Sequence, residues 1–286
     1  MTKGRSPLKT APIGVFDSGV GGLSVWREIV HLLPGESMLY LADQAHVPYG
    51  ARSPREVAAL THAAVAWLLD QGAKLIVIAC NTASAAALTS LRQQWPDVPI
   101  VGMEPAIKPA SQATKTGQVA VLATPGTLRA SRFSNLVERF ANGVQVYTLM
   151  GTGLVEMVER HELSGPAVER KLQKVMIPIQ DVAVDYLVLG CTHFPFLRES
   201  IQKVVGENVV LVDPAPAVAR QTRRVLQNRQ LQSHANGPVS WRFVTTGDLP
   251  AFRTSTKRLL GDILASPEKP ISFQALDKKK LHFSGA

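Results

Sequence analysis

Short apolar runs alternate with amphipathic, helix-like stretches along most of the 286-residue chain. Strands rich in Val, Ile and Leu are predicted at residues 12–18, 38–43, 74–80, 99–104, 118–124, 144–150, 185–191 and 208–214. Between them, residues 53–73 predict a helix with Pro54 in its first turn and Gly72 at its end. Such alternation builds βαβ units. We therefore predict an α/β fold of doubly wound, mostly parallel sheets with helices on both faces.

Length and composition favour two domains with large cores, since 45% of the residues are hydrophobic. No apolar stretch reaches about 18 residues, and residues 1–19 lack the apolar segment of a signal peptide. We therefore expect a cytoplasmic protein without a membrane partner. Two isolated cysteines predict reduced thiols, and they fit neither a disulfide framework nor a metal site.

The net charge of +9 raises nucleic acid as a partner class. The basic residues of segments 220–229 and 276–283, however, lack interleaved aromatic residues and any recognisable binding motif. A solvated basic face is therefore favoured over a nucleic-acid interface.

Strand ends and polar residues recur at similar spacings in the two halves of the chain. Cys80 follows the strand end at Asp17 by 63 residues, and Cys191 follows the one at Thr124 by 67. We infer two similar α/β domains whose strand carboxyl ends face a shared cleft, where such sheets bind ligands. The predicted first domain comprises residues 1–105 and 215–286, and the second comprises residues 106–214. Residues after about 266 are predicted to be a flexible basic appendage.

Both cysteines occupy the same local context. The segments "LIVIACNTAS" (75–84) and "YLVLGCTHFP" (186–195) each lead from an apolar strand through Cys into polar side chains. A single buried Cys is most often a small core residue, but two in matched contexts favour a chemical role. A helix N-terminus after either strand would lower the thiol pKa. His193 is a candidate acid/base partner for Cys191.

A glycine-rich loop, "FDSGVGGLS" (16–24), follows the first predicted strand. Its glycines could bring backbone N–H groups against an anion, or they could form only a tight turn. The spacing is not that of a dinucleotide-binding fingerprint. Because a carboxylate at a buried strand end is costly without a partner, Asp17 favours a functional site.

Two facing thiols suit one kind of reaction particularly well. A redox pair would place its cysteines close in sequence, and a single nucleophile would need only one. Proton transfer on both faces of one carbon needs a base on each side, one protonated and one not. A thiol, with an ordinary pKa of about 8.5, can be tuned to either state.

Several blocks together resemble glutamate racemase, within the aspartate/glutamate racemase superfamily: "FDSGVGGLSV" (16–25), "ADQAHVPYG" (42–50), "ACNTASA" (79–85), "EPA" (104–106), "VAVLAT" (119–124) and "GCTHFP" (190–195). The resemblance extends from about residue 12 to about residue 260. It implies a cofactor-independent isomerase that racemises glutamate by a two-base mechanism. It also implies a role in cell-wall biogenesis and cell shape, through D-glutamate supplied to peptidoglycan.

By match to the family's motifs, Cys80 takes the α-proton of D-glutamate with help from Asp17, and Cys191 takes that of L-glutamate with help from His193. The resemblance also implies a set of substrate-binding residues: Ser18, Pro48, Tyr49, Gly50, Asn81, Thr82, Thr124, Thr127 and Thr192. The family carries a further glutamate upstream of the second cysteine. Spacing favours Glu159 over Glu156 for that role.

Two other functions compete with this interpretation. A racemase of the same superfamily acting on aspartate or a hydantoin would keep both cysteines, but the "DSGVGG" and "PYG" motifs favour glutamate. A nucleic-acid-binding protein that kept the fold would leave the two cysteine motifs unexplained. The resemblance leaves open a homodimer and activation by a cell-wall precursor nucleotide, to which some family members respond.

Overall fold

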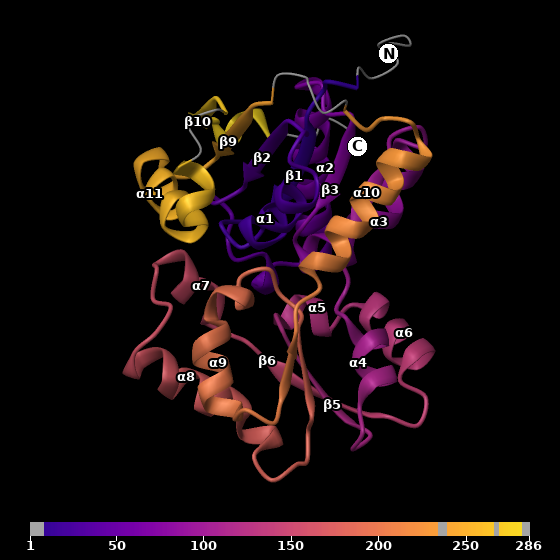
Figure 1. Cartoon of the computed structure of the whole chain (residues 1–286), viewed down its shortest axis with the longest axis vertical. Coiled ribbons are helices and arrows are strands. Elements are labelled where there is room, and N and C mark those ends of the chain that lie inside the picture. The colour runs from indigo at the N-terminus through magenta and orange to yellow at the C-terminus, as the bar shows by residue number, and fades with distance from the viewer. Residues whose placement is uncertain (1–8, 234–238, 266–268, 282–286) are drawn as a thin grey trace.

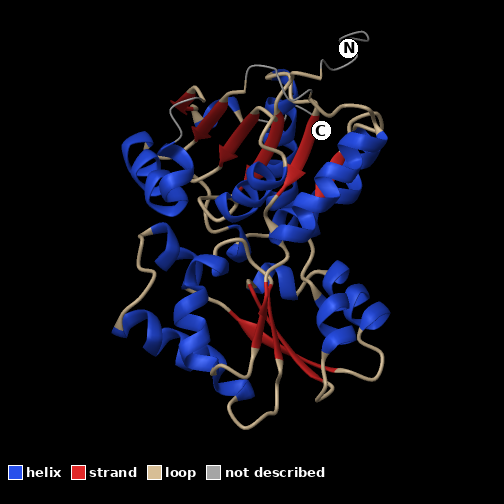
Figure 2. Cartoon of the chain, in the orientation of Figure 1, coloured by secondary structure: helices blue, strands red, loops and turns tan. Residues whose placement is uncertain are grey.

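The computed structural model describes residues 9–233, 239–265 and 269–281. The molecule consists of two bodies, drawn one above the other in Figure 1, and each contains one β-sheet flanked by helices (Figure 2). Every strand pairing within the described residues is parallel. The structure therefore has the predicted α/β class.

The first sheet has the strand order β10-β9-β2-β1-β3-β4, and the second has the order β6-β5-β7-β8. The strands of the first sheet are β1 (Ile13–Asp17), β2 (Met38–Ala42), β3 (Leu75–Ile78), β4 (Ile100–Gly102), β9 (Trp241–Thr245) and β10 (Ile271–Ala275). Those of the second sheet are β5 (Gln118–Ala123), β6 (Gln145–Met150), β7 (Tyr186–Leu189) and β8 (Val210–Val212).

The two sheets repeat one topology. Strands β1–β4 form one set in chain order and β5–β8 form another. In both sheets the strands of a set lie side by side in the order second, first, third, fourth. This confirms the prediction of two similar domains. Cys80 and Cys191 follow β3 and β7, the third strand of each set. The repeat therefore gives the two thiols equivalent places.

Successive residues of a strand point to opposite sides of the sheet, so these apolar strands present apolar side chains on both faces. Helices cover both faces of each sheet. In β3, Leu75 and Val77 pack into the core formed with α1, α10 and α11, whereas Ile76 and Ile78 pack with α2 and α3. The second sheet is covered by α4 and α6 on one face and by α7, α8 and α9 on the other. The helices of the first domain are α1 (Leu23–Leu32), α2 (Pro54–Asp70), α3 (Asn81–Gln94), α10 (Ala215–Asn228) and α11 (Leu249–Leu260). Those of the second are α4 (Ile107–Ala113), α5 (Pro125–Leu128), α6 (Ser131–Phe140), α7 (Leu154–Glu159), α8 (Pro166–Met176) and α9 (Arg198–Val205).

We propose domain boundaries after residues 105 and 214. Helix α4 follows the first boundary and packs on strands of the second sheet, while α10 follows the other boundary and packs against α1. Each crossing of the chain between the domains therefore lies just before a helix.

The predicted helix at residues 53–73 is confirmed as α2. Ser53 caps its N-terminus by accepting a hydrogen bond from the Glu56 amide at 3.2 Å, and Pro54 is its first residue. The helix ends at Asp70, and Gly72 follows with φ of +84°. That left-handed conformation suits glycine because it has no Cβ.

The prediction of a flexible tail is wrong for residues 271–281. Ile271–Ala275 form the edge strand β10, which pairs with β9, and Phe273 stacks on Phe243 with ring centroids 5.2 Å apart. Leu276 and Leu281 are buried. In β10, Ile271 and Phe273 are half-buried whereas the other three residues are exposed, so the apolar signal is weak beside the neighbouring lysines. Strand β9 was also missed. Residues 266–268 and 282–286 lie outside the described ranges.

A buried ion pair joins two segments at the amino ends of the first sheet's strands. Lys74 Nζ lies 2.6 Å from Glu36 Oε2, and both side chains are buried. Because Glu36→Ala would leave the lysine charge without its carboxylate, we expect the free energy of unfolding to fall by about 3–5 kcal/mol. Urea unfolding measures this fall. The double variant Glu36→Leu with Lys74→Met should lose less, and a loss of about 1 kcal/mol in the single variant, typical of an exposed pair, would contradict the prediction.

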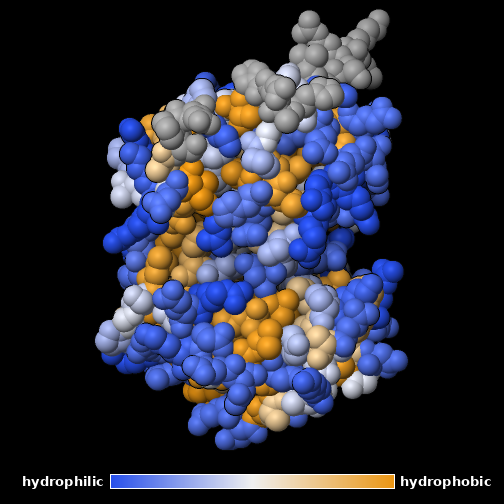
Figure 3. All heavy atoms as spheres, in the orientation of Figure 1, coloured by the Kyte–Doolittle hydropathy of each residue, from blue (hydrophilic) through white to orange (hydrophobic). Residues whose placement is uncertain are grey.

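The basic helix α10 presents a hydrophilic face to the surface (Figure 3). Arg220, Arg224 and Arg229 are exposed there, in keeping with the solvated basic face expected from the sequence. Within the described ranges, no helix combines the length and apolar character needed to cross a membrane.

Candidate active site

A buried cavity lies where the carboxyl ends of the two sheets meet. The loops after β1, β2, β3, β5 and β7 form its walls, together with α7. The residues that line it are Ser18, Pro48, Tyr49, Gly50, Cys80, Asn81, Thr82, Thr124, Val155, Cys191, Thr192 and His193. All except Val155 were candidate site residues in the sequence analysis.

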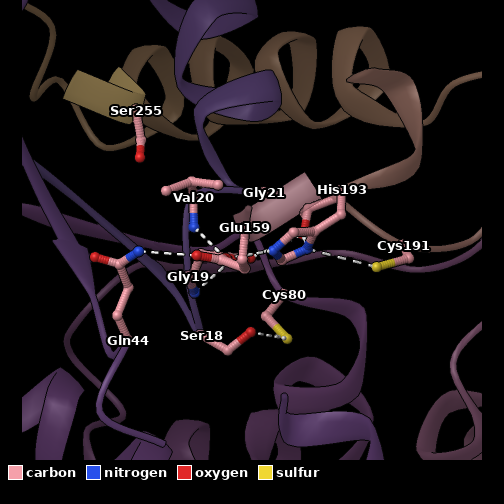
Figure 4. A network of polar contacts seen from close by, with 12 residues as sticks. Ser18, Gly19, Val20, Gly21, Gln44, Cys80, Glu159, Cys191, His193 and Ser255 are labelled. Carbon is pink, nitrogen blue, oxygen red and sulfur yellow. Dashed lines mark hydrogen bonds and ion pairs between the residues drawn. The ribbon is translucent and has the colours of Figure 1, made fainter. Parts of the chain in front are cut away.

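Three further candidates lie just behind the cavity wall. Asp17 bonds to Thr192, Glu159 bonds to His193, and Thr127 lies 3.1 Å from the hydroxyl of Thr124 and 3.2 Å from that of Thr82. The structure therefore brings every predicted site residue to the cavity or to the layer directly behind it, and Figure 4 draws the polar contacts around Glu159 and His193.

Cys80 lies at the N-terminus of α3 and is 6% exposed. Its Sγ accepts a hydrogen bond from the Ala83 amide at 3.5 Å and donates to Ser18 Oγ at 3.8 Å. Burial, and then the negative charge of Asp17, raise the pKa of Cys80 to about 12. The expected lowering of the thiol pKa by the helix N-terminus is therefore outweighed, and Cys80 is protonated at neutral pH.

Cys191 has a histidine and a carboxylate behind it. Its Sγ lies 3.7 Å from His193 Nδ1, and His193 Nε2 lies 2.7 Å from Glu159 Oε1. Burial would lower the pKa of His193, but its hydrogen bonds and charge interactions with Cys191 and Glu159 raise it well above the ordinary value. Burial would raise the pKa of Glu159, but the hydrogen bond and charge of His193 lower it. Cys191 therefore faces an imidazolium held by a carboxylate.

Asp17 is fully buried and acts on Cys80 through its charge. Its two carboxylate oxygens accept hydrogen bonds from the Gly19 amide at 2.9 Å and from Thr192 Oγ1 at 3.0 Å. Burial raises the pKa of Asp17 to about 6, against the opposing effect of the positive charge on His193. Near neutral pH, Asp17 is thus close to its own titration.

The glycine loop brings its backbone against protein carboxylates. The Gly19 amide donates to Asp17, and the Val20 amide donates to Glu159 Oε1 at 2.8 Å. A Cβ on Gly19 would lie 1.9 Å from Glu159 Oε1, and one on Gly21 would lie 2.2 Å from His193 Nδ1. The anion expected at this loop is therefore supplied by the protein, and the glycines let the acid/base groups approach.

Gly21→Ala is expected to lower kcat/KM about 100-fold for the racemisation that the sequence resemblance implies. The new methyl group would displace the His193 ring by about an ångström. Steady-state kinetics of the folded variant measures this effect. Gly143→Ala is the control: its φ is +75°, but a Cβ there meets nothing within 4 Å. The control should lose stability while its kcat/KM stays unchanged. Equal kcat/KM values for Gly21→Ala and the unsubstituted protein would contradict the prediction.

Unpartnered and clustered polar groups face the cavity from the side of α3 and α5. Both amide atoms of Asn81 are buried without a hydrogen-bond partner among the described residues, although buried polar groups are normally paired. The hydroxyls of Thr82 and Thr124 lie 2.9 Å apart. These groups can bind the polar atoms of a small, charged substrate.

Three contributors were missed from the sequence. Val155 is an apolar helix residue, so no polar signal marks it. Asp43 accepts the Tyr49 hydroxyl at 2.7 Å, and Gln44 donates to Glu159 Oε2 at 2.8 Å. Both follow the end of β2, so the rule that polar residues at strand ends build sites could have identified them.

A groove of about 710 Å³, larger than the cavity lined by the two cysteines, lies between α8, α9 and the short helix η2 (Ile177–Ile179) of the second domain. None of the predicted site residues lines it. Its size alone therefore does not identify it as the active site. Among the described residues, no group of three or more His, Cys, Asp or Glu side chains is placed to hold a metal ion.

Two α/β domains that each contribute one thiol to a shared cavity are the arrangement predicted for an enzyme that transfers protons on both faces of one carbon. Residues 13–222 match the family model described as Asp/Glu/Hydantoin racemase, and the chain belongs to this family. Its relatives include glutamate racemases. That of Roseiflexus sp. is 46% identical over 257 residues, which cover 89% of this chain and 94% of the relative. That of Pseudomonas aeruginosa is 46% identical over 263 residues, which cover 91% and 97%.

Solved structures give the same picture. A glutamate racemase isoform from Bacillus anthracis has a TM-score of 0.82 at 33% identity, covering 94% of this chain and 98% of its own. The Escherichia coli glutamate racemase, crystallised with L-glutamate and the activator UDP-MurNAc-Ala, has a TM-score of 0.77 at 34% identity, covering 92% and 98%. The resemblance to glutamate racemase found in the sequence is confirmed.

Proposed function

We propose that this chain interconverts L- and D-glutamate without a cofactor, by proton transfer between its two cysteines and the α-carbon. One observation carries the proposal: Cys80 and Cys191, from equivalent strand ends of the two repeats, line the same buried cavity. The glutamate racemases among its relatives support glutamate as the substrate. The D-glutamate formed would supply peptidoglycan synthesis.

The two thiols have different neighbours, which suggests which one gives a proton first. Cys80, with a pKa of about 12, holds its proton. The imidazolium of His193 lies beside Cys191, with Nδ1 3.7 Å from Sγ. In the L-to-D direction, Cys191 therefore accepts the α-proton, the electron pair stays on the α-carbon and its carboxylate, and Cys80 donates its proton to the opposite face. The thiols then hold the opposite states and are ready for D-glutamate.

The carbanion formed at the α-carbon needs fixed hydrogen-bond donors near the substrate carboxylate. The unpartnered amide of Asn81 and the hydroxyl of Thr82 are buried at the cavity wall, where the Thr192 hydroxyl already donates to Asp17. Donors that are already oriented can stabilise developing charge by about 3 kcal/mol each. We assign these residues, with Ser18 and Thr124, to substrate binding.

Chiral chromatography of reactions with L-glutamate, L-aspartate and a hydantoin tests the proposal against its alternatives. Purified protein dialysed against a chelator, with no cofactor added, should convert L-glutamate to the racemate. Conversion of aspartate or the hydantoin alone would replace the substrate and keep the mechanism. Salt-sensitive DNA binding without conversion of any of the three would favour the nucleic-acid alternative.

Further parts of the proposal concern partners and location. We include activation by a cell-wall precursor nucleotide, as named for the Escherichia coli relative, and a homodimer. The racemisation rate with and without UDP-MurNAc-Ala tests the first, and light scattering of the purified protein tests the second. We place the enzyme in the cytoplasm, because the mechanism needs two free thiols and reducing conditions preserve them.

A further inference from the structure

A chain of hydrogen bonds leads from the first sheet to the carboxylate behind the second cysteine. Glu159 Oε1 accepts from His193, and Glu159 Oε2 accepts from Gln44 Nε2 at 2.8 Å. Figure 4 shows Gln44 and His193 on opposite sides of the Glu159 carboxylate, with the thiol of Cys191 beyond the imidazole. The carboxylate is thus held from both sides.

Each link in this chain has a fixed donor and acceptor. Gln44 Oε1 accepts from the hydroxyl of Thr245 at 2.8 Å, and that hydroxyl oxygen accepts from the Gly247 amide at 2.9 Å. Because the Gln44 oxygen is bound to Thr245, its NH2 group must face Glu159. A Cβ on Gly247 would lie 2.8 Å from Cβ of Gln44, so this backbone packs directly on the glutamine. Thr245 itself is fully buried.

The chain also crosses between the domains. Gln44 follows β2 and Thr245 ends β9 in the first sheet, whereas Glu159 ends α7 and His193 follows β7 in the second domain. The Val20 amide gives Glu159 one more contact with the first domain, at 2.8 Å. Contact between the domains therefore fixes the orientation of the Glu159 carboxylate.

We propose that Gln44, oriented by Thr245, is a positioning residue that holds Glu159 against His193 and thereby supports proton abstraction by Cys191. This inference rests on the proposed two-base racemisation. It makes the two bases unequal, since the hydrogen bonds found for Cys80 Sγ within the described ranges are those with Ser18 and Ala83. Loss of Gln44 should therefore slow proton transfer on the Cys191 face.

The test is the Gln44→Met variant, which keeps the length of the side chain and removes both hydrogen bonds. Loss of one hydrogen bond to a charged group should lower kcat/KM about tenfold. The fall should be equal for the two enantiomers, because they have the same free energy. Thr245→Val should act in the same direction with a smaller effect.

Isotope effects distinguish a positioning role from a general loosening of the structure. The primary deuterium isotope effect on kcat/KM should rise with α-deuterated L-glutamate, because transfer to Cys191 becomes rate-limiting. With α-deuterated D-glutamate it should fall, towards the equilibrium isotope effect for moving the deuteron from the α-carbon to the Cys80 thiol. Thr256→Val is the control. Thr256 is fully buried in α11 and its hydroxyl donates to the Phe252 carbonyl at 2.8 Å, so its variant should leave both isotope effects unchanged.

An unchanged kcat/KM in Gln44→Met, equal shifts of both isotope effects, or a rise with D-glutamate alone would overturn the inference. A protein without substitutions that fails to racemise glutamate would instead overturn the proposed function. The two failures are therefore distinguishable. Circular dichroism spectra that match those of the unsubstituted protein establish that each variant is folded.

Discussion

Alanine at Cys80 or at Cys191 is expected to lower kcat for glutamate racemisation about 10⁴-fold, the upper range for loss of an acid/base group. Each thiol is the proton carrier for one face of the substrate, and both faces are needed in every turnover. The neighbouring groups cannot replace it, because His193 lies behind Cys191 and Asp17 is bonded to Gly19 and Thr192. Chiral assays over long incubations measure the residual rate.

The double variant Cys80→Ala with Cys191→Ala should be no slower than either single variant, because removing one member already disables the pair. Ser200→Ala is a suitable control. Its hydroxyl is buried and donates to the Leu163 carbonyl at 2.9 Å, and Ser200 is not among the residues that line the cavity. A single cysteine variant that keeps a tenth or more of the kcat of the unsubstituted protein would contradict the two-base account.

Asp17→Asn is expected to lower activity and raise stability together. The pKa of Asp17 is about 6 in the folded protein, raised from 3.8 by burial. Between these values the folded state binds more protons than the unfolded state, so stability falls as pH rises from about 4 through about 6. Asparagine does not ionise, so the variant avoids the free-energy cost of charging a buried carboxyl group. At pH 8 the variant should be more stable by about 3 kcal/mol, since a tenfold change in an acid dissociation constant corresponds to about 1.4 kcal/mol.

Urea unfolding at pH 4 and pH 8 tests the effect on stability, because the gain should be present at pH 8 and absent at pH 4. The same substitution at Asp185 is the control. Burial would raise the pKa of Asp185, but hydrogen bonds from Thr114 and from the Lys115 and Thr116 amides lower it, so Asp185→Asn should destabilise. Activity of Asp17→Asn should fall about 100-fold, as for an acid/base group. A variant less stable than the unsubstituted protein at pH 8 would contradict the account.

The sequence predicted those parts of the fold that leave a local pattern. Strands buried on both faces, such as β3, appear as continuous apolar runs, and α2 carries its own start and stop signals in Ser53, Pro54 and Gly72. Strand β10 was missed because an edge strand needs no continuous apolar run. Its place depends on pairing with β9, which local sequence does not specify.

The site was predictable where chemistry repeats and hidden where it depends on distant partners. The matched contexts of Cys80 and Cys191 marked both thiols. The bond between Gln44 and Glu159 joins residues 115 positions apart, and the bond between Thr192 and Asp17 spans 175 positions. Such contacts are set by how the two sheets face each other. The glycine loop carried a signal, but the residues it accommodates could be named only from the structure.

Proton NMR of the purified protein with L-glutamate in D2O, followed by chiral analysis of the product, tests the central claim most directly. The two-base account predicts that the α-proton signal disappears as D-glutamate forms, and that the D-glutamate carries deuterium at its α-carbon from the second thiol. Inversion that retains the original α-proton would contradict the account, because one group would then have served both faces. Absence of both exchange and inversion would contradict it as well, and would leave Cys80 and Cys191 as core residues.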